Sequence, residues 1–261
     1  MPLPSEITDW ISRSEVDHIG PFVNAWAAFN AWFRYVSQSS QDREGLNYVR
    51  TRPNSVRGAI LPMLDPLTDD TPDASEFKTL VAALHGALEA YRLETIYKGK
   101  LETVSLRSVP IKPAQRLPYG WTHNGFTYEV LRQNQQWISR IANRAGVDVL
   151  RIEQDVYDLQ NMTNDSRFQV IRPAQQGQMR AAYLACTPRP MTDLIAGDEP
   201  PIRAGTITFG CTCEELFGGI VETIYRMRNM LLHGELKPHD AALACYQPAY
   251  HLLRRMLREC R

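Results

Sequence analysis

The sequence predicts a mainly α-helical protein with a small β-hairpin insertion, and two observations support this. Apolar residues recur at steps of three and four in most of the chain, which is typical of amphipathic helices. Residues 97–130 instead include an alternating apolar stretch and an Asn-Gly pair, which is typical of a hairpin. No internal repeat is evident in the 261 residues. We therefore expect one domain, residues 1–261, with a β insertion at 97–130.

The first strong helix is expected over about residues 14–38. Its aromatic residues stand at helical spacing: Phe22, Trp26, Phe29 and Phe33. So broad an apolar face must be covered, either by the core or by a second subunit. A further helix is expected over residues 76–95, with Ser75 as its N-cap.

The middle of the chain combines strand and helix patterns. Residues 101–111 alternate as a strand does, and Asn124-Gly125 favours a tight turn before a returning strand at 127–130. Helices are expected to resume over about 130–144 and 148–161, separated by Gly146, and then over 175–186.

The last third of the chain returns to a helical pattern. Residues 187–208 are rich in proline and other turn-forming residues, so they predict a long loop. Two final helices are expected over about 213–233 and 238–259, the second kinked at Pro248.

Composition limits the classes of function. The 29 Lys and Arg residues balance the 29 Asp and Glu residues, whereas a general nucleic-acid binder is usually strongly basic. RNA would therefore have to bind at a local basic patch. The five cysteines are odd in number and match neither a disulfide framework nor zinc-ligand spacing. With no signal peptide and no membrane-spanning stretch in the sequence, we expect a cytoplasmic protein without a membrane partner, metal or cofactor.

One short segment has the residue types needed for chemistry. The segment Arg228-Asn229-Met230-Leu231-Leu232-His233 lies near the end of a predicted helix and is followed by Gly234. It resembles the signature of the HEPN (higher eukaryotes and prokaryotes nucleotide-binding) family, in which an Arg, a polar residue and a His stand near a helix end. The segment Phe29-Asn30-Ala31-Trp32-Phe33 also resembles the opening helix of some members. Glu235 replaces the Tyr of the toxin–antitoxin subgroup, which puts membership of that subgroup in doubt.

The resemblance implies a HEPN-like helical bundle and a metal-independent ribonuclease. It implies that Arg228 and His233 form the catalytic pair and that Asn229 is a supporting polar residue. Family members commonly act as homodimers and often serve as toxins or defence effectors. The implied partners are therefore an RNA substrate, a second copy of the chain and an antitoxin or regulatory protein.

The same residue types suit RNA cleavage on chemical grounds. RNA is cut without metal when its 2′-hydroxyl attacks the adjacent phosphate, which requires a base for that proton and an acid for the departing 5′-oxygen. Histidine suits either task near neutral pH. Arginine binds phosphate oxygens bidentately and stabilises their developing charge. Because one His does not easily serve both sides of the phosphate, the motif favours a symmetric dimer with a composite cleft.

Helix geometry leaves the identity of the working arginine open. On an unbroken helix Arg228 and His233 lie about 140° apart, whereas Arg226 and His233 lie about 20° apart. Either the helix ends before His233 or Arg226 shares the work. The basic residues expected to contact RNA are Arg226, Lys237, Arg254, Arg255 and Arg258. For those of the last helix, a solvated face that complements the helix dipole is an equal alternative.

Two other functions compete with the nuclease. A non-catalytic HEPN-like module would bind RNA, nucleotide or a protein partner without cutting, and the balanced charge favours it. A plain helical scaffold is favoured if Arg228 is buried in a structural ion pair. The signatures of P-loop, dinucleotide-binding, zinc-peptidase and serine-hydrolase proteins do not occur in the sequence.

Overall fold

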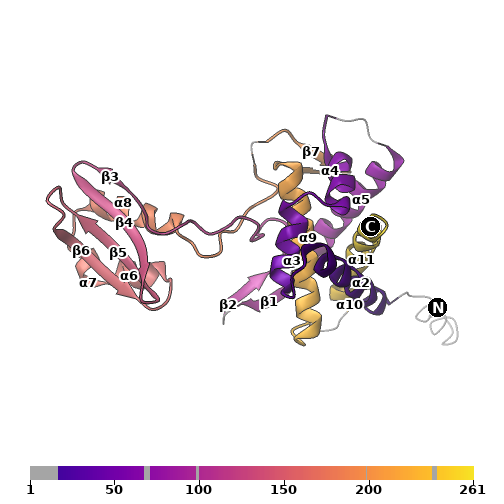
Figure 1. Ribbon diagram of the computed structural model, residues 1–261, viewed down its shortest axis with the longest axis horizontal. Coiled ribbons are helices and arrows are strands. Elements are labelled where there is room, and N and C mark those ends of the chain that lie inside the picture. The colour runs from indigo at the N-terminus through magenta and orange to yellow at the C-terminus, as the bar shows by residue number, and fades with distance from the viewer. Residues whose placement is uncertain (1–16, 68–70, 98–99, 198, 237–239) are drawn as a thin grey trace, which may run out of the picture. The chain divides into compact units, whose positions relative to one another are not determined.

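The computed structural model describes residues 17–67, 71–97, 100–197, 199–236 and 240–261. About 50% of the chain is helical and 19% is strand. The prediction of a mainly α protein with one hairpin is therefore wrong, because the fold is mixed α/β. The chain divides into two compact units, one formed by residues 1–111 and 191–261 and the other by residues 112–190 (Figure 1). This division differs from the expected single domain with an insertion at 97–130.

The first unit is built mostly of helices. They are α2 (Ile19–Ser37), α3 (Asp42–Thr51), α4 (Ser55–Leu64), α5 (Pro72–Tyr91), α9 (Cys213–Leu232), α10 (Asp240–Ala244) and α11 (Tyr246–Leu257). Its two antiparallel ribbons pair β1 (Glu94–Tyr97) with β2 (Lys100–Thr103), and β7 (Ile202–Ala204) with β8 (Ile207–Phe209). Helix α11 packs against α2 and α5, whereas α9 packs against α3 and α4.

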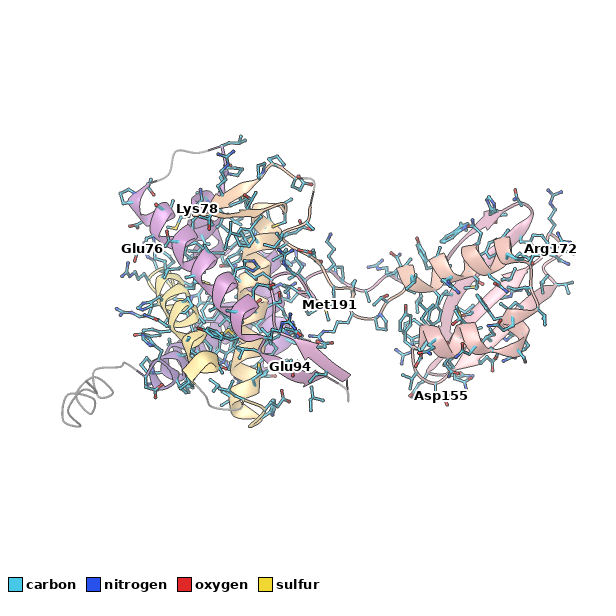
Figure 2. All side chains as sticks on the ribbon, turned by 180° about the vertical axis from the view of Figure 1, so that it is seen from behind. Glu76, Lys78, Glu94, Asp155, Arg172 and Met191 are labelled. Atoms are coloured by element: carbon cyan, nitrogen blue, oxygen red, sulfur yellow. The ribbon has the colours of Figure 1, made fainter. Side chains whose placement is uncertain are left out.

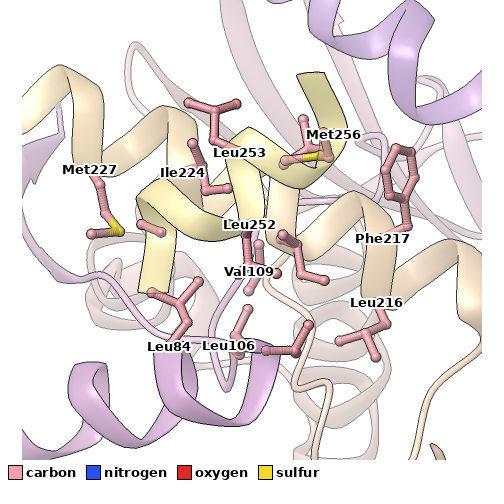
Figure 3. Packing of buried hydrophobic residues seen from close by; sticks show 14 of the residues in the cluster. Leu84, Leu106, Val109, Leu216, Phe217, Ile224, Met227, Leu252, Leu253 and Met256 are labelled. Carbon is pink, nitrogen blue, oxygen red and sulfur yellow. The ribbon is translucent and has the colours of Figure 1, made fainter. Parts of the chain in front are cut away.

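The core of this unit forms around α9 and α11. Ile224 and Met227 of α9 and Leu252 and Leu253 of α11 belong to one buried cluster, part of which Figure 3 shows. All four side chains are buried, and each contributes about 1.5–3 kcal/mol by leaving water. This packing holds α9 in place, and α9 carries the candidate catalytic segment.

The aromatic face of α2 is covered within the same unit. Phe22, Phe29 and Phe33 are fully buried in its core. Gly45 of α3 lies so close to α2 that a Cβ there would stand 2.4 Å from a ring carbon of Phe33. The close contact between α2 and α3 therefore depends on glycine at this position.

The second unit is a four-stranded antiparallel sheet with helices on one face. The strands, in the order β3-β4-β5-β6, are Tyr119–His123, Phe126–Gln133, Gln136–Ala142 and Asp148–Gln154. The helices that follow are α6 (Leu159–Asn164), α7 (Ser166–Gln169) and α8 (Pro173–Ala185). Tyr128 pairs with Ile141, which pairs with Leu150, and this row packs with Met179 and Tyr183 of α8. The unit therefore has a core of its own.

The helices expected over 130–144 and 148–161 are largely strands β5 and β6. Asn134 and Gln135 both adopt positive φ, 50° and 67°, and form the turn between β4 and β5 without a glycine. Ile138 is buried although its neighbours Trp137 and Ser139 point to the opposite face. The sequence therefore lacks the clear alternation that identifies a strand.

The other sequence predictions have mixed outcomes. The turn at Asn124-Gly125 is confirmed, with φ values of 48° and 78° and His123 paired with Phe126. The strand expected over 101–111 ends at Thr103, and the loop expected over 187–208 contains β7. Helix α5 begins at Pro72 and is capped by Thr71 rather than by Ser75. Pro248 lies in the first turn of α11, where its missing N–H leaves no helical bond unmade.

Two further findings concern the described residues of both units: the character of their helices and the state of their cysteines. No helix within the described ranges has the length and apolar character needed to cross a membrane. All five cysteines are free thiols. Burial raises the pKa of Cys186 to about 11 and that of Cys211 to about 12, so both remain protonated and unreactive near neutral pH.

We predict that residues 112–190 fold as an isolated fragment, because the sheet and its helices form a separate core. The fragment should give dispersed amide signals in NMR spectra and a single cooperative thermal transition. Ile141→Ala should lower its stability by about 2–4 kcal/mol, because the change leaves a cavity in that core. A wild-type fragment with the narrow amide dispersion of an unfolded chain would contradict this prediction.

We predict that His85 makes the protein less stable in acid. Burial lowers the pKa of this imidazole below its ordinary 6.5, so the unfolded chain binds the proton more readily than the folded one. The free energy of unfolding should therefore fall as the pH drops below about 6.5. His85→Leu should reduce the slope of stability against pH in urea titrations between pH 7 and pH 5. An unchanged slope would count against the prediction.

Candidate functional site

The candidate motif occupies the last turns of α9 and the residue that caps it. The helix begins with a capping box between Thr212 and Glu215. At the other end His233 is the C-cap, and Gly234 adopts the left-handed conformation with φ of 66°. The Glu235 N–H donates to the Met230 carbonyl at 2.9 Å, which completes a Schellman motif. The exposed His233 side chain therefore stands where the chain leaves the helix.

The end of α9 does not bring Arg228 and His233 onto one side of the helix. The His233 N–H still donates to the Asn229 carbonyl at 2.9 Å, so His233 follows the helical path. Around the axis of α9, the His233 Cα therefore remains about 140° from the Arg228 Cα. Within the described residues no hydrogen bond or ion pair joins the two side chains. Asn229 lies between them in angle, about 40° from His233.

Arg228 is held in a partly exposed position between α9, α2 and α3. Its Nη1 donates to the Asn229 Oδ1 at 2.9 Å, and its Nη2 lies 3.7 Å from the Asp42 Oδ2. The guanidinium stands 5.8 Å from the centroid of the Trp26 ring. One fifth of the side chain is exposed. The structure thus orients the guanidinium but leaves it within reach of a ligand.

Arg226 has a different environment. Its guanidinium donates to the Ser108 and Thr103 carbonyls and to the Glu102 carboxylate, and its side chain is only 4% exposed. These contacts fasten α9 to β2 and to the segment after it. Arg226 therefore does not share a solvent-facing site with His233, although helix geometry made it a candidate.

The predicted RNA-binding residues of α11 and its C-cap do not gather at the end of α9. Lys237 lies outside the described residues. Arg255 is nearly buried and pairs with Asp73 and Glu259, whereas Arg254 and Arg258 are exposed. The first residue of α11, Tyr246, bonds to the Met227 carbonyl of α9. Arg254 and Arg258 follow it by about 12 and 18 Å along the helix axis.

Three side chains that the sequence analysis missed lie near this part of α9: Asp42 contacts Arg228, Arg34 contacts Asp42, and Arg43 contacts Tyr225. Arg34 of α2 donates two hydrogen bonds to the Asp42 Oδ1, at 3.2 and 2.8 Å, while Arg228 approaches the other oxygen. Arg43 of α3 lies over the Tyr225 ring, 4.9 Å from its centroid. No short motif links these positions to residue 228, so only the packing of α2 and α3 on α9 reveals them.

A buried ion cluster holds α3 against α9. The Glu222 side chain is fully buried, and its Oε2 accepts from Arg43 at 2.6 Å and from Arg50 at 3.1 Å. Arg50 also donates to the Ile111 carbonyl at 2.6 Å. Burial lowers the pKa of Arg50, while Glu222 opposes that shift and Arg43 adds to it. The cluster is thus a fixed structural element that places Arg43 next to Tyr225.

A pocket of about 490 Å³ adjoins the end of α9. Its apolar lining comes from the end of α5, the β1–β2 ribbon and the residues around the α9 terminus: Tyr91, Leu93, Ile96, Leu101, Met230 and Leu236. Glu94, labelled in Figure 2, opens β1 and also lines the pocket. Glu235 accepts hydrogen bonds from the Thr95 hydroxyl and the Ile96 N–H, which ties the ribbon to the segment after His233.

No protein-family model matches this chain, and neither the search of curated proteins nor the search of solved structures found a match. Its function is therefore inferred from its own residues and their geometry.

We predict that Arg226 and Arg228 differ sharply in their effect on stability. Arg226→Met removes a buried guanidinium that pairs with Glu102 and bonds to two carbonyl groups, and should cost about 3 kcal/mol. Arg228→Met removes a long ion pair from a partly exposed position and should cost less than about 1 kcal/mol. Urea unfolding of the two variants provides the comparison, and equal losses would contradict the assigned roles.

Proposed function

We propose that this chain is a metal-independent endoribonuclease of the HEPN type that acts as a homodimer. The observation that carries the proposal is the end of α9. There an oriented, partly exposed arginine and an exposed histidine stand on one helix, in the Arg-Asn-x-x-x-His pattern. Asn229 supports the arginine through its hydrogen bond.

Each residue has a defined task in the proposed reaction. The 2′-oxygen of RNA attacks the adjacent phosphorus, and the bond to the 5′-oxygen breaks. The His233 imidazole accepts the 2′-hydroxyl proton, and a second imidazole protonates the departing 5′-oxygen. Arg228 binds the phosphate oxygens and stabilises the charge that builds on them. The products are a 2′,3′-cyclic phosphate and a free 5′-hydroxyl.

The helix geometry supports a site made by two chains. Arg228 and His233 of one chain lie about 140° apart around α9, and His233 is the histidine that the described residues place at this helix end. Two α9 ends related by a two-fold axis would supply the second imidazole and a second arginine. We therefore propose that cleavage requires the dimer and that the RNA lies between the two α9 ends.

The proposed setting is a cytoplasmic defence or stress response, with the activity controlled by an antitoxin or regulatory protein. Five free thiols fit a reducing compartment. A ribonuclease of this kind needs such control because uncontrolled cleavage of cellular RNA is toxic.

A specific observation favours a second candidate function, a non-catalytic HEPN-like module that binds RNA. Asp42 lies 3.7 Å from the Arg228 guanidinium and offsets part of the positive charge that would stabilise a transition state. Together with the angle between Arg228 and His233, this arrangement suits binding without cleavage. A cleavage assay distinguishes the two functions, because only the nuclease breaks the RNA chain.

We expect purified protein to cleave single-stranded RNA in the presence of a chelator. His233→Ala should lower the rate at least about 100-fold, because it removes the proton-transfer group. RNA with a 2′-deoxy group at the cleaved position should resist cleavage, and mass spectrometry should identify 2′,3′-cyclic phosphate ends.

The matched control is His123→Ala, which removes another exposed histidine, from the end of β3. This variant should cleave as the wild type does. Cleavage that survives His233→Ala, or that stops with the chelator, would refute the proposed mechanism. Tight RNA binding without any cleavage by the wild-type dimer would favour the binding module.

A further inference from the structure

A continuous strip of arginine and aromatic side chains runs over α2, α3 and α9. Arg34 meets Asp42, Asp42 meets Arg228, and Arg228 lies over Trp26. The strip continues because the Trp26 and Tyr225 ring centroids are 5.9 Å apart, and Arg43 lies over Tyr225. Each of these contacts lies within the first unit, and the buried Trp26 ring links the three arginines from beneath.

The strip has more positive than negative charge. Asp42 is shared by Arg34 and Arg228, and Glu222 is shared by Arg43 and Arg50. Four guanidinium groups therefore face two carboxylates. Around the axis of α3, the nearby Glu44 lies about 160° from Asp42 and about 100° from Arg43. Its carboxylate therefore does not neutralise the remaining positive charge of the strip.

The excess positive charge lies on the two most exposed arginines of the strip, Arg34 and Arg43, which are its outer members. The side chains of Arg34 and Arg43 are 47% and 52% exposed, whereas that of Arg50 is 9% exposed and that of Glu222 is fully buried. Each outer arginine shares its carboxylate with a more buried one, so part of its hydrogen-bonding capacity faces solvent. Guanidinium groups in this position bind phosphate oxygens readily.

We propose that Arg34 and Arg43 bind the phosphate backbone of a single-stranded RNA whose reacting phosphate lies at Arg228. This inference rests on the proposed function and adds two substrate-binding residues that the Arg-Asn-x-x-x-His motif does not contain. Asp42 acts as a positioning residue, because it holds Arg34 and Arg228 side by side. The Trp26 ring is buried and the Tyr225 ring is partly buried, so the rings support the arginines and do not stack on bases. RNA is favoured over an acidic polypeptide because guanidinium groups bind phosphate oxygens bidentately and Arg228 is proposed to hold a phosphate.

The test measures binding separately from cleavage. A fluorescently labelled 2′-O-methyl RNA, which has no free 2′-hydroxyl to attack, is titrated with full-length protein at several salt concentrations. Arg34→Gln/Arg43→Gln should weaken binding about tenfold or more near physiological salt. Because two phosphate contacts are lost, the slope of log K against log salt should become shallower by about 1.4 for a single strand. Arg34→Lys/Arg43→Lys, which keeps the charge, should restore most of that slope.

The matched control removes two other exposed arginines of the same unit, Arg52 and Arg203, by substitution with glutamine. This control should bind as the wild type does, and thermal unfolding should show all the variants folded. If Arg34→Gln/Arg43→Gln binds like the control, or if polyglutamate competes with RNA at equal charge concentration, the inference is overturned.

The outcomes separate this inference from the proposed nuclease. If the wild type cleaves RNA but Arg34→Gln/Arg43→Gln binds and cleaves normally, the nuclease stands and the arginine strip is rejected. If the wild type binds RNA without cleaving it, and the double variant loses that binding, the strip stands and the nuclease is rejected. If the wild type neither binds nor cleaves RNA, both are rejected.

Discussion

The buried carboxylate of Glu222 is the constraint on which the rest of the candidate site depends. A charge removed from water must be paired, because an isolated buried carboxylate costs several kcal/mol. Arg43 and Arg50 supply that pairing from two turns of α3, and this fixes both the position and the direction of α3 on α9. With α3 so placed, its first residue, Asp42, lies beside Arg228 and brings Arg34 of α2 with it.

The requirement that a buried charge be paired also distinguishes two arginines of α9. Arg226 faces the β1–β2 side and satisfies the Glu102 carboxylate and two carbonyl groups inside the unit. Arg228, two residues later, turns toward α2 and remains partly exposed. Spacing alone cannot distinguish them, because both are arginines on a helix and Arg226 has the better angle to His233. What distinguishes them is which neighbouring element approaches each face of α9.

The two units also differ in how far local sequence determines them. In the first unit α2 and α9 carry strong apolar periodicity, so their existence and approximate limits were predicted correctly. In the second unit the turn between β4 and β5 uses Asn134 and Gln135 at positive φ, and Ile138 is buried on the face opposite the core. Neither feature is a usual strand signal, and the region was mistaken for helix.

The sequence by itself determined the features that depend on neighbouring residues: helix α9 with its glycine stop after His233, the Asn124-Gly125 turn, and the motif residues Arg228, Asn229 and His233. These follow from periodicity, capping and turn conformation, which act over a few positions. Only the tertiary structure decided that the chain has a four-stranded sheet, that Arg226 and Arg255 are used internally, that Arg34 shares Asp42 with Arg228, and that Arg43 packs on Tyr225. Those outcomes depend on burial and charge pairing between segments far apart in the chain, and no local sequence pattern predicts which segments come into contact.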